Sequence, residues 1–451
     1  MSDTGCGQGA GVVGAADIAA CAATEADALR AAGIGPGDSV GWLALNSPRA
    51  LALLQACEQL GARCVPLNWR LAAPELAAQV RHAGLQLLLH DDAQAQLAAA
   101  VVALAPLPQP RASGHRPGDV MLVYTSGTTG EPKGVVHTAA GMRANVAMAI
   151  ATQGLDANTR TLAVLPLFHI GGLCIQVLPT LAASGRVKLH ARFDADAWFD
   201  DVAAWRPTTT LLVPAVMRAL IEHPRWAAAD LSSLAFVSAG SQVVPRPPME
   251  AFHARGIPVA QVYGATETGP VTLVLPPAEA FVHVGSVGRP APGVQARLVA
   301  GELQVHAPNL ARGYHGRPDD PAFAPDGWFA TGDLARVDAD GRYQIIGRSK
   351  ELIISGGENI LPAEIEQVAL EDSSVAEAVA IGLPDARWGE VPVLALVARA
   401  GAMPDLARLQ AAFDARLARF KHPRRIVVLP EFPRTALGKV AREALKTRLL
   451  A

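Results

Sequence analysis

The chain has 451 residues, of which 50% are apolar and 18% charged, and its formal net charge is −2. This composition supports a large buried core and excludes global disorder. The balanced charge excludes a chain-wide basic field of the kind that attracts nucleic acid or acidic membranes.

Two further sequence features bear on the compartment of the protein. No run of about 18 apolar residues occurs, so no membrane span is expected. The first residues lack the basic and then apolar order of a secretory signal, so we expect a cytoplasmic protein. The five cysteines are odd in number and include no C-x-x-C pair. Neither a disulfide framework nor a structural zinc site is therefore expected.

The first hundred residues are rich in Ala and Leu and predict two helices, over 26–32 and 50–60. The apolar segment 40–45 lies between them, follows a Gly- and Pro-containing turn, and is typical of a buried strand. Residues 104–118 are rich in Pro and Gly and predict a surface connection.

Five short apolar runs then alternate with helical stretches, which indicates βαβ units and a mostly parallel sheet covered by helices. In such sheets ligands bind beyond the carboxyl ends of the strands, and the polar motifs of this chain fall there. These runs span 120–124, 162–165, 210–213, 235–237 and 259–262.

The pattern changes twice more along the chain. Near residue 285 short alternating segments begin, such as 296–307, and these are typical of an antiparallel or barrel-like unit. After Gly347 a separate set of strands and helices is predicted, which suffices for a small α+β domain. The expected strands cover 352–354, 375–381 and 391–397, and the expected helices 363–370, 406–417 and 440–450.

The segment 124–135, Y-T-S-G-T-T-G-E-P-K-G-V, carries the strongest chemical signal. A predicted strand leads into a loop of glycines, hydroxyl side chains and Lys133. Glycine lets backbone N–H groups approach phosphate oxygens closely, and a lysine adds positive charge. The spacing differs from G-x-x-x-x-G-K-[ST], which disfavours a P-loop kinase.

This loop resembles the phosphate loop of the adenylate-forming superfamily, which includes acyl- and aryl-CoA synthetases, peptide-synthetase adenylation domains and luciferases. Four later segments resemble further motifs of that superfamily in order and spacing, and the resemblance runs from about residue 35 to 451. The segments are 263–269 (YGATETG), 327–333 (GWFATGD), 347–360 (GRSKELIISGGENI) and 433–439 (PRTALGK).

The resemblance implies an α/β fold. Its large N-terminal domain, 1–347, would hold layered αβ subdomains with mostly parallel sheets and a small β-barrel-like unit. A small mobile α+β lid domain, 348–451, would follow. Superfamily members usually carry several dozen more residues ahead of the segment that matches 35–38. That difference affects stability and oligomeric state more than the chemistry. Whether the protein forms a homodimer is left open.

The resemblance also implies an ATP-dependent acid–CoA ligase, in which a carboxylate attacks the α-phosphate of ATP and a thiol then displaces AMP. Because both reactants of the first step are anionic, cations and hydrogen-bond donors are required. Glu267 and Thr128 would bind Mg²⁺, which prefers oxygen ligands. The ATP phosphates would be held by Thr125, Ser126, Gly127, Thr128, Thr129, Gly130 and Lys133.

Other positions of the motifs carry implied roles in the first half-reaction. Asp333 would accept hydrogen bonds from the ribose hydroxyls with Arg348 nearby, and Lys439 would reach the α-phosphate and the substrate carboxylate. The adenine pocket would be formed by Ser238, Ala239, Gly240, Ser241, Tyr263, Gly264, Ala265 and Thr266.

Thioester formation implies a second domain orientation, with Lys350 at the hinge. Ser355, Gly356 and Gly357 would then line a narrow pantetheine channel. An aromatic side chain can stack on the CoA adenine and a cation can meet its phosphates. The residues implied for CoA are Trp388, Phe420, Lys421 and Arg424.

The acid would lie beside His169, with Gly171, Gly172, Tyr263 and Gly264 around it. Residues 161–180 contain no Lys, Arg, Asp or Glu, and residues 259–276 contain only Glu267. A second buried carboxylate would need a cationic partner. We therefore expect an apolar fatty or aryl monocarboxylic acid, although Arg186, Lys188 or Arg218 could still reach into the pocket.

Three alternatives stay open. The first is a dicarboxylate ligase of the o-succinylbenzoate type, because 355–366 resembles succinylbenzoate– and halobenzoate–CoA ligases. The second is transfer of the acyl group to a carrier protein, which shares the pantetheine arm with CoA. The third is a catalytically silent nucleotide-binding protein, against which intact Glu267, Asp333 and Lys439 argue. No motif or basic stripe favours a nucleic-acid partner.

Overall fold

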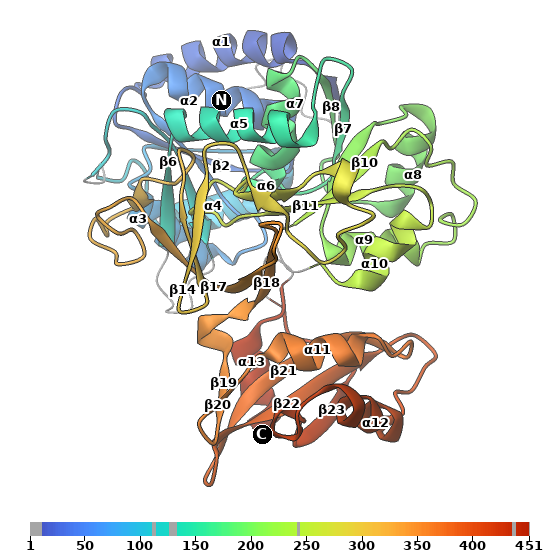
Figure 1. Ribbon diagram of the computed structural model, residues 1–451. Helices are drawn as coiled ribbons and strands as arrows, with labels where there is room; N and C mark the ends of the chain where they lie inside the picture. The colour runs from blue at the N-terminus through green and yellow to red at the C-terminus, as the bar shows by residue number, and fades with distance from the viewer. Residues whose placement is uncertain (1–10, 111–113, 126–132, 241–243, 435–438, 451) are drawn as a thin grey trace. The chain divides into compact units, whose positions relative to one another are not determined.

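The computed structural model (Figure 1) describes residues 11–110, 114–125, 133–240, 244–434 and 439–450. The chain forms two compact units, one of residues up to 296 together with 305–330, and one of 297–304 together with 331–451. This division assigns 331–347 to the C-terminal unit, whereas a lid boundary at 347/348 stays a prediction.

An eight-stranded sheet runs through the first unit, and its central strands β8, β7, β9, β10 and β11 are parallel. The expected alternation of buried strands and helices is therefore confirmed. In spatial order the strands are β1 (Val12–Val13), β8 (Arg186–Leu189), β7 (Arg160–Ala163), β9 (Thr209–Leu212), β10 (Phe236–Gly240), β11 (Val259–Tyr263), β12 (Leu273–Leu275) and β13 (Arg289–Pro290).

A six-stranded sheet forms the other half of this unit. Strands β5, β3, β2 and β4 are parallel, whereas β6 and β16 add an antiparallel edge. Its spatial order is β16 (Gly313–Tyr314), β6 (Lys133–Thr138), β5 (Asp119–Thr125), β3 (Arg63–Pro66), β2 (Ser39–Leu43) and β4 (Leu87–His90).

Helices cover these sheets (Figure 1), and local sequence explains where several of them begin and end. Helix α5 begins after Thr138, whose hydroxyl accepts the Gly141 N–H at 3.0 Å, and it ends at Gly154 with φ +66°. The helices are α1 (Ala15–Ala31), α2 (Pro48–Leu60), α3 (Ala73–Ala83), α4 (Ala95–Leu104), α5 (Ala139–Gln153), α6 (Ile170–Gly172), the π-helical η2 (Leu173–Val177), α7 (Leu178–Ala182), α8 (Ala195–Ala204), α9 (Pro214–Ile221) and α10 (Arg246–His253).

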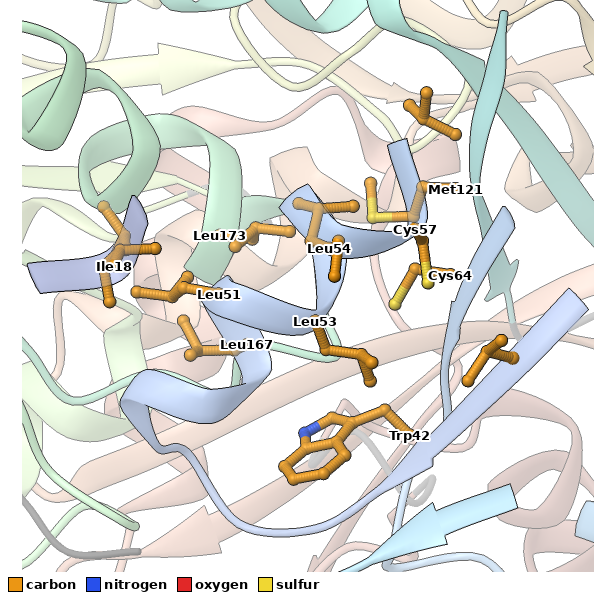
Figure 2. Packing of buried hydrophobic residues seen from close by; sticks show 14 of the residues in the cluster. Ile18, Trp42, Leu51, Leu53, Leu54, Cys57, Cys64, Met121, Leu167 and Leu173 are labelled. Atoms are coloured by element: carbon orange, nitrogen blue, oxygen red, sulfur yellow. The ribbon is translucent and has the colours of Figure 1, made fainter. Parts of the chain in front are cut away.

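The largest apolar cluster joins α1 and α2 to the segment that carries His169. Figure 2 shows Leu51 and Leu54 of α2 beside Leu167 and Leu173, which flank that segment. Burial of a side chain of this size contributes about 1.5–3 kcal/mol. The loop around His169 is thus fixed to the core at both ends.

The state of the cysteines can be compared with the expectation that the chain has no disulfide framework. Cys57, Cys64 and Cys174 are free and buried, and Cys57 and Cys64 lie together in the cluster of Figure 2. Cys21 is disulfide-bonded, which was not anticipated but does not by itself make the disulfide framework that the sequence argued against.

The second unit contains a five-stranded sheet in which β22 pairs with β19, β21 and the parallel β23. Its strands are β19 (Ile353–Ser355), β20 (Glu358–Ile360), β21 (Val375–Asp385), β22 (Gly389–Ala398) and β23 (Arg425–Leu429), and its helices α11 (Pro362–Leu370), α12 (Leu406–Arg416) and α13 (Arg442–Leu450). The small α+β domain expected here is confirmed. Strand β23 was not foreseen.

A four-stranded sheet stands where short alternating strands were expected. Its order is β14 (Gln295–Val299), β15 (Glu302–His306), β17 (Phe329–Val337) and β18 (Tyr343–Arg348). Ala300 and Gly301 connect β14 to β15, with φ of +49° and +83°. This two-residue turn is of the type that matches the twist of a hairpin.

Candidate active site

The phosphate-loop motif lies between two paired strands. Strand β5 ends at Thr125 and β6 begins at Lys133, and these two residues are directly opposite in the antiparallel register. The hydroxyl of Tyr124, next to Thr125, donates to the Gln79 carbonyl at 3.1 Å and lies 2.9 Å from His82 Nδ1. The base of the loop is therefore held in place, while Ser126, Gly127, Thr128, Thr129 and Gly130 lie outside the described residues.

Tyr314 of strand β16 links Glu267 to strand β6, which follows this loop, a connection that sequence reasoning missed. Tyr314 pairs with Val135 of β6, and its hydroxyl donates to Glu267 Oε1 at 2.7 Å. Lys133 Nζ lies 5.3 Å from the centre of the Tyr314 ring. One tyrosine thus contacts both the carboxylate expected to bind metal and the lysine expected to bind phosphate.

Burial and the neighbouring Glu267 carboxylate raise the pKa of Tyr314 far above its ordinary value. The hydroxyl therefore stays protonated and remains a donor to Glu267 across the physiological range. The only sequence signal for this residue is its place in A-R-G-Y, two residues before the Gly316 turn.

The expected adenine-pocket residues lie at the ends of two neighbouring parallel strands. Gly240 ends β10 opposite Val262 of β11, which is followed by Tyr263 and Gly264. A Cβ on Gly264 would lie 2.2 Å from the Pro270 carbonyl oxygen, so only glycine fits this turn. Ala239, Ala265 and Thr266 lie in the same two segments, and Ser241 falls outside the described residues.

Ser238 departs from the expected adenine pocket. It is fully buried, and its hydroxyl donates to Gln153 Oε1 at 2.8 Å within the protein core. Its side chain therefore supports the strand from behind rather than facing a nucleotide.

His169 occupies the position just before α6, at the carboxyl edge of the large sheet, and is half-buried beside Phe168, with the ring centres 6.2 Å apart. Gly171 and Gly172, expected in the acid pocket, follow within α6 and are buried. The charge-free run 161–180 therefore begins in strand β7 and is helical from Ile170 onward.

Asn46 positions this loop, and the sequence analysis missed it. Its Nδ2 donates to the carbonyl oxygens of Leu165 at 2.9 Å and His190 at 3.0 Å, and its Oδ1 accepts the Leu167 N–H at 2.8 Å. Asn46 is 5% exposed, so these three bonds are protected from water. The N-S pair, separated from strand β2 by Ala44 and Leu45, was the available signal.

Arg70 is a second residue that the sequence analysis missed. Its guanidinium carbon lies 4.9 Å from the ring centre of Trp69 and 5.9 Å from that of Phe168. Such geometry is typical of a cation–π contact. A cation therefore lies next to the loop that carries His169.

The second unit carries the expected ribose-binding pair. Asp333 of β17 lies directly opposite Arg348 of β18, and Arg348 Nε is 2.6 Å from Asp333 Oδ1. Asp333 is buried, whereas the Arg348 side chain is 45% exposed. Lys350 follows in a short 3₁₀ turn (η4, Ser349–Glu351) and is exposed.

Lys439 is exposed at the base of a loop whose two sides pair through Arg434 and Val440. Two arginines anchor this base. Arg434 pairs with Glu377 at 2.7 Å, and Arg442 pairs with Glu366 at 2.7 Å and with Glu351 at 3.2 Å. The lysine motif is therefore tied to the turn that contains the expected hinge.

The structure brings part of the expected CoA site together. Gly356 donates its N–H to the Trp388 carbonyl at 2.8 Å, and a Cβ at Gly356 would lie 2.6 Å from the Trp388 ring. Arg387 and Arg424 lie over that ring, at 4.8 and 5.9 Å from its centre. Ser355 and Gly357 flank Gly356 in the turn between β19 and β20.

Lys421 departs from the simple expectation for this site. Its Nζ is bonded to both oxygens of Glu364, at 2.9 and 2.8 Å, so its charge is already balanced within the protein. The neighbouring Phe420 is 43% exposed and has Lys421 Nζ 5.8 Å from its ring centre. Arg387, which was not anticipated, joins Arg424 as a cation at Trp388.

Comparison with known proteins bears on the whole of this arrangement. The model of the AMP-binding enzyme family matches residues 16–315, and that of the AMP-binding enzyme C-terminal domain matches residues 364–439. The chain belongs to the AMP-binding enzyme family. The resemblance expected from the five motifs is therefore confirmed.

Individual relatives agree with the family. An indoleacetate–CoA ligase from Aromatoleum aromaticum is 40% identical, with 96% of this chain and 92% of the relative covered. A feruloyl-CoA synthase from an Amycolatopsis species is 37% identical, with 96% and 93% covered. The structure of the Bacillus subtilis o-succinylbenzoate CoA synthetase in complex with its acyl-adenylate intermediate is similar with a TM-score of 0.84 and 30% identity, covering 96% of this chain and 92% of that one.

The chain is accordingly an acid–CoA ligase that works through an acyl-adenylate, as the sequence predicted. No helix of the described ranges is long and apolar enough to cross a membrane.

Proposed function

We propose that the acid activated by this ligase is an apolar monocarboxylate, aryl or fatty, and that the residues described above act in two half-reactions. The observation that carries the proposal is the helix after His169. It presents no charged side chain, because residues 170–182 are all uncharged. An ionised second carboxylate buried there would lack a partner, which is strongly unfavourable.

Two of the cations that could have served a dicarboxylate are engaged elsewhere. Lys188 contacts Asp201, and Arg186 lies 3.5 Å from Asp17. Two relatives named after aryl acids, indoleacetate and ferulate, support an aryl substrate. Arg70, which lies over Phe168, is a cation that could pair with a second carboxylate. Turnover of dicarboxylates would therefore contradict the proposal.

In the first half-reaction Lys133 and the loop that it follows would bind the phosphates of ATP. Attack of the acid carboxylate on the α-phosphate forms the acyl-adenylate and expels pyrophosphate. Lys133 is half-buried, so its charge acts on the phosphates with less screening by water than at an open surface. Tyr263 and Gly264 would form the floor of the adenine pocket.

The residues present fit a Mg²⁺ ion. Mg²⁺ commonly uses one or two carboxylates together with substrate phosphates, and Glu267 supplies one carboxylate, bonded to the tyrosine that contacts Lys133. When bound, Mg²⁺ would balance charge on the phosphates during pyrophosphate release. Thr128 would be its second protein contact, as the family motif suggests.

Residues of the second unit would complete both half-reactions. Asp333 would accept the ribose hydroxyls, held in orientation by Arg348, and Lys439 would meet the α-phosphate and the acid carboxylate. Lys350 would be the hinge about which the domain orientation changes from the first half-reaction to the second. Trp388, with Arg387 and Arg424 over its ring, would bind the CoA nucleotide, and Gly356 would leave room for the pantetheine arm.

A carrier protein is a second candidate acceptor of the acyl group. A fatty acid–[acyl-carrier-protein] ligase from Streptomyces coeruleorubidus is 36% identical, with 94% of this chain covered. The cations at Trp388 favour free CoA, because a carrier protein brings the pantetheine arm without an adenine nucleotide. A homodimer and a cytoplasmic location stay predictions from the sequence.

Pyrophosphate release from ATP and Mg²⁺ tests the proposal, with pooled fatty, aryl and dicarboxylic acids, each with and without CoA. We expect release with aryl or fatty pools that rises when CoA is added. Release with dicarboxylates alone would refute the substrate class. Acid-dependent release that CoA never raises would point to a carrier protein.

A further inference from the structure

A buried amide network lies between helical segment η2 and the large sheet, outside the residues assigned above. The Nε2 atom of Gln176 lies 2.8 Å from Thr209 Oγ1, 3.1 Å from Ser238 Oγ and 3.3 Å from Gln153 Oε1. Gln176 is 1% exposed. Its Oε1 is buried and has no hydrogen-bond partner among the residues that the structure describes.

The network itself fixes which way the Gln176 amide points. Gln153 Nε2 donates to the Ile175 carbonyl at 2.9 Å, so Gln153 Oε1 must face Gln176 and Ser238. An oxygen of Gln176 at that position would meet another acceptor, which is repulsive. Nε2 of Gln176 therefore belongs to the network, and Oε1 is directed away from it.

Gln176 also lines a small cavity next to the expected acid pocket. The cavity has a volume of about 10 Å³, roughly room for one polar group such as an N–H or O–H. Its other lining residues are apolar apart from Thr161; they include Leu165, Gly172 and Leu211. Gly172 is one of the residues implied for the acid pocket, so the cavity adjoins the place where that pocket is expected.

Local backbone geometry places Gln176 at this point. Residues Leu173–Val177 form a π-helical turn, a feature that is rare and often found at functional sites. A Cβ on Gly172 would lie 2.2 Å from the Pro166 carbonyl oxygen, so the helix lies directly against the His169 loop. The same short segment thus contacts the loop that carries His169 and supplies the unpaired oxygen.

We propose that this cavity receives a hydrogen-bond donor carried by the acid at the end away from its carboxylate, with Gln176 Oε1 as the acceptor. The inference rests on the proposed function and narrows it to aryl acids that bear a ring N–H or O–H. An amide oxygen accepts hydrogen bonds only, so it disfavours a second carboxylate. A plain alkyl chain or an unsubstituted ring would leave the buried oxygen unsatisfied, which costs free energy.

The test compares kcat/KM for pairs of acids that have the same shape but differ in the donor. Suitable pairs are indole-3-acetate with 1-benzofuran-3-acetate, and 4-hydroxycinnamate with 4-fluorocinnamate. Both members of a pair are assayed with one enzyme preparation, so the ratio is independent of how much of the protein is folded. We expect the wild-type enzyme to prefer the donor-bearing member of at least one pair by about tenfold.

Two variants separate a binding role of Gln176 from a structural one. Gln176→Met keeps the length of the side chain and removes the acceptor, so the ratio should fall to about one. Thr210→Val is the matched control, because Thr210 is fully buried, its hydroxyl donates to the Leu162 carbonyl at 2.8 Å, and it does not line the cavity. This variant should lower stability and leave the ratio unchanged.

Several outcomes would overturn the inference. A wild-type ratio near one for both pairs would mean that a water molecule satisfies Gln176. A preference that survives in Gln176→Met would place the donor elsewhere. Turnover of alkyl acids alone would refute the inference while leaving the ligase proposal intact, whereas no pyrophosphate release with any acid would refute both.

Discussion

The hydroxyl of Tyr314 offers a sharp test of how the metal carboxylate is positioned. Replacing Tyr314 with Phe removes the donor that lies 2.7 Å from Glu267 Oε1. The ring remains, so its packing against Phe323, with ring centres 5.4 Å apart, and its contact with Lys133 at 5.3 Å are retained. The substitution therefore isolates a single hydrogen bond.

The size of the effect follows from the charge and exposure of the pair. A hydrogen bond to a charged group contributes about 1.5–3 kcal/mol. Both Tyr314 and Glu267 are half-buried, so the lower end of that range applies. A loss of about 1.4 kcal/mol lowers kcat/KM about tenfold. We expect this loss for MgATP, together with a higher Mg²⁺ concentration at half-maximal rate.

The assay is initial-rate pyrophosphate release over a Mg²⁺ titration, with binding of MgATP measured separately by calorimetry. Tyr343→Phe is the control, because Tyr343 lies on β18 in the other compact unit and has no role proposed above. In a Glu267→Gln background the further effect of Tyr314→Phe should nearly vanish. An unchanged Mg²⁺ dependence in Tyr314→Phe, or a full effect that persists beside Glu267→Gln, would refute the positioning role.

Three further predictions concern other parts of the protein. Asn46→Ala leaves the Leu165, Leu167 and His190 backbone groups unpaired, so we expect a lower melting temperature and about a tenfold loss of kcat/KM for the acid; an unchanged acid kcat/KM in folded protein would contradict it. Trp388→Ala should raise the KM for CoA and leave CoA-independent adenylate formation, measured by ATP–pyrophosphate exchange, unchanged; a loss of exchange would place Trp388 in the first half-reaction. Burial lowers the pKa of His137 from 6.5 to about 4, so the neutral side chain favours folding above pH 6.5 and this contribution is lost as pH falls toward 4. His137→Phe should therefore lose less stability than wild type between pH 6.5 and 4 in thermal denaturation, and equal slopes would refute the assignment.

The sequence predicted the order of strands and helices well because the buried strands of a parallel sheet are short apolar runs. The strands expected at 120–124 and 259–262 are observed as Asp119–Thr125 and Val259–Tyr263. Charged or short edge elements were missed: β23 (Arg425–Leu429) begins with Arg and β16 (Gly313–Tyr314) has two residues. Such strands exist through pairing with a neighbour, and periodicity within the strand cannot reveal the neighbour.

The candidate site divides in the same way. Motif spacing located Lys133, Glu267 and Asp333, whose residue types follow directly from phosphate, metal and ribose chemistry. Tyr314 and Asn46 could not be found by that route, because their partners are distant in the chain. Tyr314 bonds Glu267, 47 positions away, and Asn46 bonds residues at least 119 positions away. Only the fold brings them into hydrogen-bond distance.

The positions of Asn46, Tyr314 and Gln176 also follow one physical logic. Each catalytic or binding segment lies at a strand end or a short helix, where backbone groups lose their regular partners. Asn46 satisfies such backbone groups from another element and thereby fixes a loop, whereas Tyr314 holds a side-chain carboxylate in place. Gln176 differs, because its donor atom is fully used while its acceptor has no partner. Other buried oxygens of the described residues also lack a partner, among them Gln79 Oε1 and Asn309 Oδ1. Gln176 is set apart because it lines a cavity that it shares with Gly172, a residue expected in the acid pocket. A donor carried by the acid therefore accounts for its free acceptor in a way that packing alone does not.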